Sequence, residues 1–244
     1  MEDRKTAGLP MTTAKDFRLL SLQISIFTPT LLFSTSKIFE KLMSKYASIF
    51  NGDALSIPMP PNTPKEIPRI ILPSSDGKLK LEIAENRANF FRYRQEDDTK
   101  IDEDSFFKLC LDVFKDYIDC TSATVGRLAL VAVRFCEKDN PGAELAKHFC
   151  KDRYITEPFN RPQNFEIHAH KIYKFDDFEV NSWVRCKTGT LTKENKPIMV
   201  VQEDINTLAE KIEQNSFDNK EMKKFIELTI KEQEAILKKY FPNE

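Results

Sequence analysis

The chain has 244 residues, of which 41% are hydrophobic and 31% are charged, and this composition is typical of a folded globular protein rather than a disordered one. Its 37 basic residues are balanced by 38 acidic ones, so no overall positive field favours binding to nucleic acid or to an anionic membrane. The sequence has only six glycines, and it contains no glycine-rich phosphate loop and no nucleophile elbow. This argues against a conventional nucleotide-binding enzyme.

The first half of the chain predicts a strand, a helix, a group of strands and a second helix. Residues 1–16 are polar, and we expect a flexible leader there. Strands are predicted where every second residue is apolar, and helices where apolar residues recur three or four positions apart. Asp76-Gly77 is a typical hairpin turn. The predicted elements are a strand at 17–27, a helix at 37–50, three strands within 69–94 and a helix at 102–120.

The second half repeats this order of elements. Its first strand is almost continuously apolar, which is typical of a central strand buried on both faces. Asp176-Asp177 marks the turn between two later strands. The predicted elements are a strand at 124–135, a short helix at 142–154, two strands within 164–191, a strand at 196–206 and a long helix at 218–241.

Hairpins therefore dominate the predicted connections, and adjacent hairpin strands run antiparallel. We expect an α+β fold, mainly an antiparallel sheet, with helices packed on one face. Residues 17–244 are predicted to form a single domain. The order of elements is compatible with two related β-α-β-β halves, 17–120 and 121–244.

The stretch "EIHAH" is the part of the sequence that most resembles a metal-binding or catalytic motif. In a strand, side chains two apart share a face, so Glu166, His168 and His170 point the same way. Two histidines so spaced can ligate zinc or iron when another ligand arrives, either Glu166 or His148 from the preceding helix. One hypothesis is thus a metal-dependent hydrolase centred on these residues, and the alternative is the polar face of an ordinary strand.

The stretch "NFFRYR" interleaves aromatic and basic side chains, as surfaces that stack single-stranded nucleic acid do. Its candidate residues for such binding are Phe91, Arg92, Tyr93 and Arg94. The alternation places Phe91 with Tyr93, and Phe90 with the two arginines. The acidic segment that follows would repel phosphate, and a half-buried strand with an arginine-rich face has the same pattern.

Two further passages are predicted to be apolar strands that also contain charged residues. "VGRLALVAVRF" precedes the predicted short helix, and "IMVVQEDINT" precedes the last helix. Both resemble a sporadically distributed bacterial family of uncharacterised proteins of about this length. The matching positions are Arg127, Leu128, Leu130, Arg134, Asp204, Ile205 and Asn206. The resemblance implies no established activity, but a sporadic distribution suggests mobile or defence-associated genes.

The remaining observations concern the compartment and the partners. Five widely spaced cysteines without a C-x-x-C motif indicate free thiols in a reducing compartment. The apolar stretch 19–33 is interrupted by Gln23 and Pro29 and is too short to span a bilayer. We therefore expect a cytoplasmic, non-catalytic interaction protein without a cofactor, which acts through a protein partner or as a homo-oligomer and does not enter the membrane.

Overall fold

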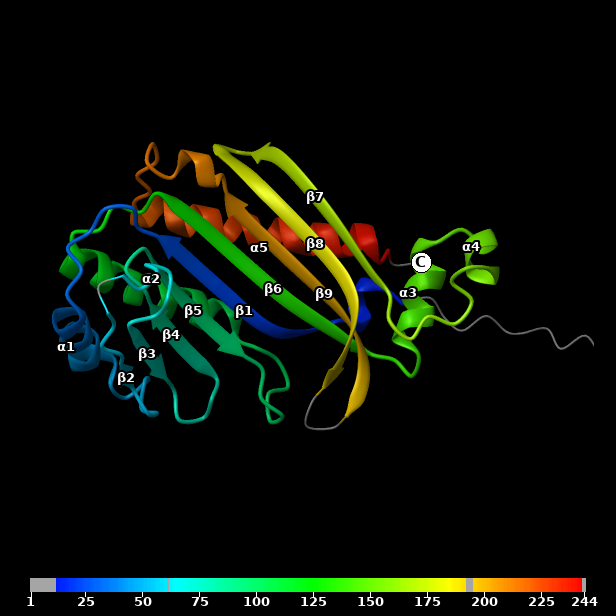
Figure 1. The fold of residues 1–244 in the computed structure, drawn as a ribbon, viewed down its shortest axis with the longest axis horizontal. Coiled ribbons are helices and arrows are strands. Elements are labelled where there is room, and N and C mark those ends of the chain that lie inside the picture. The colour runs from blue at the N-terminus through cyan, green and yellow to red at the C-terminus, as the bar shows by residue number, and fades with distance from the viewer. Residues whose placement is uncertain (1–11, 61, 192–194, 243–244) are drawn as a thin grey trace, which may run out of the picture.

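The computed structural model describes residues 12–60, 62–191 and 195–242. In these residues nine strands form one strongly twisted sheet (Figure 1). The strands are β1 (Arg18–Phe27), β2 (Leu55–Ser56), β3 (Ile70–Pro73), β4 (Leu79–Ile83), β5 (Arg87–Tyr93), β6 (Arg127–Glu137), β7 (Glu166–Phe175), β8 (Phe178–Leu191) and β9 (Lys196–Thr207). The helices are α1 (Thr35–Tyr46), α2 (Glu103–Thr121), α3 (Pro141–Phe149), α4 (Asp152–Thr156) and α5 (Asn219–Tyr240), with short 3₁₀ turns η1 (Ala14–Asp16) and η2 (Ala209–Lys211).

The strand order across the sheet is β2-β3-β4-β5-β1-β6-β9-β8-β7, and every neighbouring pair is antiparallel. The predicted α+β fold with a mainly antiparallel sheet is confirmed. Strands β1 and β6 lie side by side at the centre. The first half of the chain builds the sheet outward from β1, and the second half builds it outward from β6. Strand β7 is the last strand on the second side.

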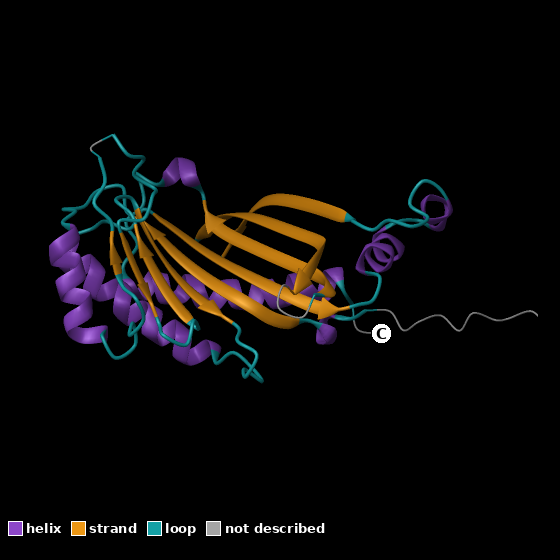
Figure 2. Ribbon diagram, turned by 60° about the horizontal axis from the view of Figure 1, so that its bottom comes forward, coloured by secondary structure: helices purple, strands orange, loops and turns teal. Residues whose placement is uncertain are grey.

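The long helices α1, α2 and α5 cover one face of this sheet, as predicted, and none of the helices in the described ranges lies over the other face (Figure 2). Capping residues define the starts of the two longest. Asp102 accepts a hydrogen bond from the backbone N–H of Ser105 at α2, and Asp218 with Glu221 forms a capping box at α5. Each cap satisfies backbone donors that lack a partner inside the helix.

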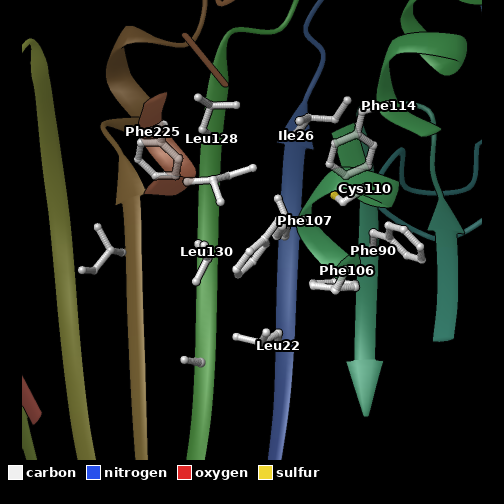
Figure 3. Close-up of a cluster of buried hydrophobic side chains, with 14 of the residues drawn as sticks. Leu22, Ile26, Phe90, Phe106, Phe107, Cys110, Phe114, Leu128, Leu130 and Phe225 are labelled. Carbon is white, nitrogen blue, oxygen red and sulfur yellow. The ribbon is translucent and has the colours of Figure 1, made fainter. Parts of the chain in front are cut away.

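The hydrophobic core lies between these helices and the sheet. Figure 3 shows aromatic side chains of α2 packed on β1, β5 and β6. Phe90 of β5 is fully buried, with its ring centroid 5.7 Å from that of Phe50 and 5.3 Å from that of Phe106. Cys110 is also buried in this cluster. The large number of phenylalanines thus fills the helix-covered side of the sheet.

The structure differs from the predicted elements in two details. The helix predicted at 142–154 is two helices, α3 and α4, because the backbone is extended at Cys150 and Lys151. Of the predicted leader, residues 1–11 lie outside the described residues, whereas Ala14 donates its N–H to the carbonyl of Phe241 at 2.8 Å. Within the described ranges, no helix combines the length and the apolar character that crossing a membrane requires.

Candidate functional site

Strand β7 has two distinct faces. Phe165, Ile167, Tyr173 and Phe175 pack against the core on the helix-covered side. The alternating residues, which include the "EIHAH" candidates, therefore point to the helix-free side. Glu166 and His168 contact each other there, with 2.7 Å between Oε1 and Nε2. This hydrogen bond is the main reason why the pKa of Glu166 lies below its usual value.

The second histidine of the pair is engaged elsewhere. The ring of His170 stacks on Trp183 of β8 at 4.2 Å, and its Nε2 contacts the side-chain oxygen of Asn181. His148 lies on the helix-covered side, where its Nε2 donates to the carbonyl of Tyr240 at 2.6 Å. Among the residues that the structure describes, no group of three or more His, Cys, Asp or Glu is placed to hold a metal ion.

The aromatic and basic residues of "NFFRYR" make separate contacts and do not form one surface together. Phe91 and Tyr93 stack with their rings nearly parallel and 5.7 Å apart, and the ammonium of Lys80 lies over both rings. Arg92 forms an ion pair with Asp98 at 2.8 Å, and Arg94 reaches only a backbone carbonyl at 3.5 Å. The cation that accompanies the aromatic pair is therefore Lys80, which the sequence pattern did not indicate.

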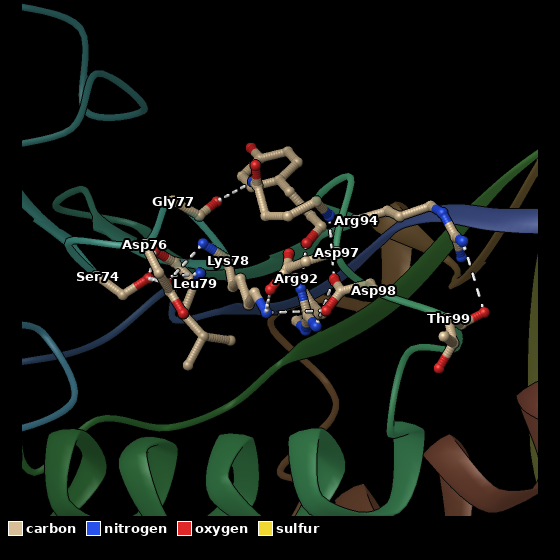
Figure 4. A network of polar contacts seen from close by, with 12 residues as sticks. Ser74, Asp76, Gly77, Lys78, Leu79, Arg92, Arg94, Asp97, Asp98 and Thr99 are labelled. Carbon is tan, nitrogen blue, oxygen red and sulfur yellow. Dashed lines mark hydrogen bonds and ion pairs between the residues drawn. The ribbon is translucent and has the colours of Figure 1, made fainter.

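Asp98 is the centre of the polar network that holds Arg92 (Figure 4). It accepts a hydrogen bond from the backbone N–H of Gln95 at 3.0 Å and lies 3.0 Å from the ammonium of Lys78. Burial acts to raise the pKa of Asp98, but the hydrogen bonds from Gln95, Lys78 and Arg92 outweigh it and lower the pKa from 3.8 to about 2. The ionised form is thus the one that the fold stabilises.

Asp98→Asn is therefore expected to reduce the acid sensitivity of the protein. Because its pKa is lower in the folded state, the charge of Asp98 contributes stability above its ordinary pKa of 3.8, and this is lost as the pH falls to about 2. Urea unfolding of the wild type and the variant at stepped pH values checks this. Asp97→Asn is the matched control, because the Asp97 side chain is 73% exposed. If the free energy of unfolding fell with decreasing pH as steeply in the Asp98 variant as in the wild type, the assigned role of Asp98 would be contradicted.

The other notable feature of β7 is its free edge. Among the described residues it pairs with β8 alone, through the hairpin at Asp176-Asp177. The carbonyl of Phe165 accepts from the N–H of Thr188 on the β8 side. Backbone groups alternate in direction along an antiparallel strand. The N–H and C=O groups that point away from the sheet are thus those of Glu166, His168, His170, Ile172 and Lys174.

A cavity of about 670 Å³ lies beneath this edge, between β7, β8 and the last two turns of α5. The opposed pair Ala169 and Val184, together with Ser182, forms its floor. These side chains are small, whereas Phe165 and Phe175 near the strand ends are large, so the middle of the two strands leaves a hollow. The remaining lining comes from β7 (Lys171 and Tyr173), from α3 (His148 and Phe149), and from α5 and the residues just after it (Glu232, Ile236, Lys239, Tyr240 and Pro242).

The polar groups of the cavity are partly paired with one another. Tyr173 donates its hydroxyl to Glu232 at 3.0 Å. Burial, with a smaller contribution from Glu232, raises the pKa of Tyr173 to about 12, so this hydroxyl stays protonated. Lys171 and Lys239 stand at the exposed rim. In the described part of the chain, neither lysine has an acid or an acceptor within bonding distance.

Neither the edge nor the cavity was predicted from the sequence. A signal for the cavity does exist on the helix-facing positions of β7, which run from Phe165 through Ala169 and Lys171 to Phe175. A small residue followed by a cation interrupts this apolar row. The position of β7 at the edge has no such signal, because it depends on which strands pair.

The fold and this site define an α+β protein with one antiparallel sheet, a free edge strand and a cavity below it. No family model matches the chain, and no curated protein matches it. One solved structure, described as "Methanococcus jannaschii TBP", is similar over 92% of this chain and 98% of its own, at 11% identity and a TM-score of 0.25. A TM-score this low gives the similarity no weight for function.

Proposed function

We propose that the protein is a non-catalytic interaction protein that self-associates through the edge of β7. The observation that carries this is the free edge itself, along which every second residue from Glu166 to Lys174 points its N–H and C=O groups outward, without a partner in the described part of the chain. Such an edge is a template for pairing with another strand. The other edge of the sheet, β2, has two residues and offers much less.

The sequence of the edge favours a second copy of the same strand. Facing residues of antiparallel strands alternate between pairs that exchange both backbone hydrogen bonds and pairs that exchange none, and the outward-facing residues of an edge form the first kind. A two-fold axis through His170 pairs all five outward residues: His170 with the same residue of the other copy, Ile172 with the partner's His168, and Lys174 with the partner's Glu166. The charged ends of the edge are therefore complementary to themselves.

Neighbouring registers are less favourable. Moving the axis by one residue toward the C-terminal end of β7 places Lys171 directly opposite the partner's Lys171, and like charges in that position are destabilising. Moving it by one residue toward the N-terminal end places Lys174 opposite the partner's Asn164, which precedes β7, so the pairing of Lys174 with Glu166 is lost. Moving it by two residues leaves part of the edge unpaired. The pairing at His170 is also isologous, which produces a closed dimer with a continuous sheet rather than a growing fibre. The apolar and exposed Ile172, at 63% exposure, becomes covered in it.

Charge reversal at the edge tests this register. Lys174→Glu places two carboxylates together at both ends of the strand pair, and Glu166→Lys places two ammonium groups there. Each is expected to raise the dissociation constant on the order of tenfold, because two pairs of about 0.2–1 kcal/mol change from attraction to repulsion. The double variant, and an equal mixture of the two single variants, should both restore association, as measured by sedimentation equilibrium.

A backbone variant separates edge pairing from side-chain effects. Ile172→Pro removes one outward N–H and no bond within the sheet, because proline is tolerated at an edge position whose N–H faces solvent. Its mass in solution should be that of the 28.3 kDa monomer, while the matched control Ile172→Ala, which keeps the N–H, should still associate. A wild-type protein that is monomeric at every concentration, or a proline variant that associates normally, would overturn the proposal.

A further inference from the structure

The cavity beneath β7 combines an apolar interior with unneutralised positive charge at its rim. Its volume of about 670 Å³ lies within the range of sites that enclose small organic ligands. The floor is apolar apart from the buried Ser182, and the end wall is aromatic. There the ring of Phe149 meets that of Tyr240 edge-on at 6.1 Å. A flat apolar group suits such a wall because aromatic rings pack edge-on or offset-stacked.

The carboxylate that lines the cavity is already bonded, whereas the two lysines at the rim are available to a ligand. Glu232 is its one carboxylate among the described lining residues, and it already accepts the hydroxyl of Tyr173. His148 already donates to the carbonyl of Tyr240. Lys171 and Lys239 approach the rim from β7 and α5 respectively, and their ammonium groups have no partner in the described chain. An anion at the rim supplies that partner, and charge-assisted hydrogen bonds to it are stronger than neutral ones.

We propose that this cavity binds an amphipathic carboxylic acid with an aromatic body. The body lies on Ala169 and Val184 against the aromatic wall, and the carboxylate accepts hydrogen bonds from Lys171 and Lys239. Nothing in this site requires the dimer, since every lining residue comes from one chain. The protein thus carries a small-molecule site next to its association edge.

Naphthalene-2-carboxylate, its neutral amide and the cationic naphthalen-2-ylmethylamine are the probes, titrated into the full chain by calorimetry. The acid is expected to bind at least tenfold more tightly than the amide, and the amine not at all. Lys239→Glu should abolish this preference for the acid. Lys238→Glu is the matched control, because it changes the net charge equally at the neighbouring exposed residue, which does not line the cavity.

A second variant tests the location. Ala169→Leu adds bulk to the cavity floor and should remove binding of both acid and amide, with the near-ultraviolet circular dichroism of the fold retained. No binding of the acid, equal binding of acid and amide, or equal effects of Lys238→Glu and Lys239→Glu would overturn the proposal. The Ile172→Pro variant, which removes an outward N–H of the association edge, is titrated with the same probes. Binding of the acid by this variant shows that the cavity acts independently of the dimer, so a failure of one proposal is distinguished from a failure of the other.

Discussion

Replacing Glu203 by alanine is expected to lower the free energy of unfolding by about 3–5 kcal/mol, because it leaves a buried cation without its partner. Glu203 of β9 is fully buried beneath α5, and its carboxylate pairs with the guanidinium of Arg134 on β6. Gln233 of α5 donates to the backbone carbonyls of Leu130 and Glu203 at 3.2 and 3.1 Å. The ion pair therefore lies where the terminal helix meets the centre of the sheet.

A double replacement separates the value of the pair from the cost of breaking it. Arg134→Met combined with Glu203→Leu removes both charges and should recover most of the lost stability, since apolar residues of similar size often replace a buried ion pair without net cost. Gln202→Ala, one residue away and on the helix-free side of β9, is the control and should change stability little. Urea denaturation measures all four proteins. A loss below about 1 kcal/mol in Glu203→Ala would contradict this role.

Phe90→Ala is expected to cost about 3–5 kcal/mol, the range for removing a fully buried aromatic ring and leaving a cavity. Phe90 lies between Phe50 and Phe106, so it joins the segment that follows α1 to α2. The loss should appear as a lower midpoint of urea unfolding with an unchanged slope, because the surface exposed on unfolding changes little.

The next residue provides the matched control. Phe91→Ala removes the same side chain from the same strand, but from the helix-free face, where Phe91 is only partly buried and stacks on Tyr93. Its expected cost is about 0.5–1.5 kcal/mol, the value of an aromatic pair beyond its area. Equal losses in the free energy of unfolding for Phe90→Ala and Phe91→Ala would contradict the assignment of one face of β5 to the core and the other to the helix-free side.

Local patterns in the sequence were enough to predict most elements. The alternation in residues 17–27 and the helical spacing in 218–241 correspond to β1 and α5 within a few residues, because each pattern reflects burial of one face. The Asp176-Asp177 turn lies where it was expected. The single helix predicted at 142–154 was wrong at Cys150 and Lys151, where the extended backbone divides it into α3 and α4 without a glycine or proline to mark the break.

The two passages behind the family resemblance illustrate what pairing adds. They form β6 and β9, which are neighbours in the sheet with Leu130 opposite Ile205. Arg127 contacts the side chain of Asn206 and donates to the carbonyl of Thr207 at 3.1 Å. Some 80 residues separate these groups in the chain, so no local pattern relates them.

The amino-acid sequence by itself determined the α+β class, the antiparallel hairpins and the two faces of each strand, because propensity, turn chemistry and alternation act over a few residues. The tertiary structure decided which strand is left at the edge, and this follows from long-range pairing. It also decided that His170 stacks on Trp183 and that Lys171 and Lys239 line the same cavity. Such contacts depend on how distant elements pack, which no short window of residues encodes.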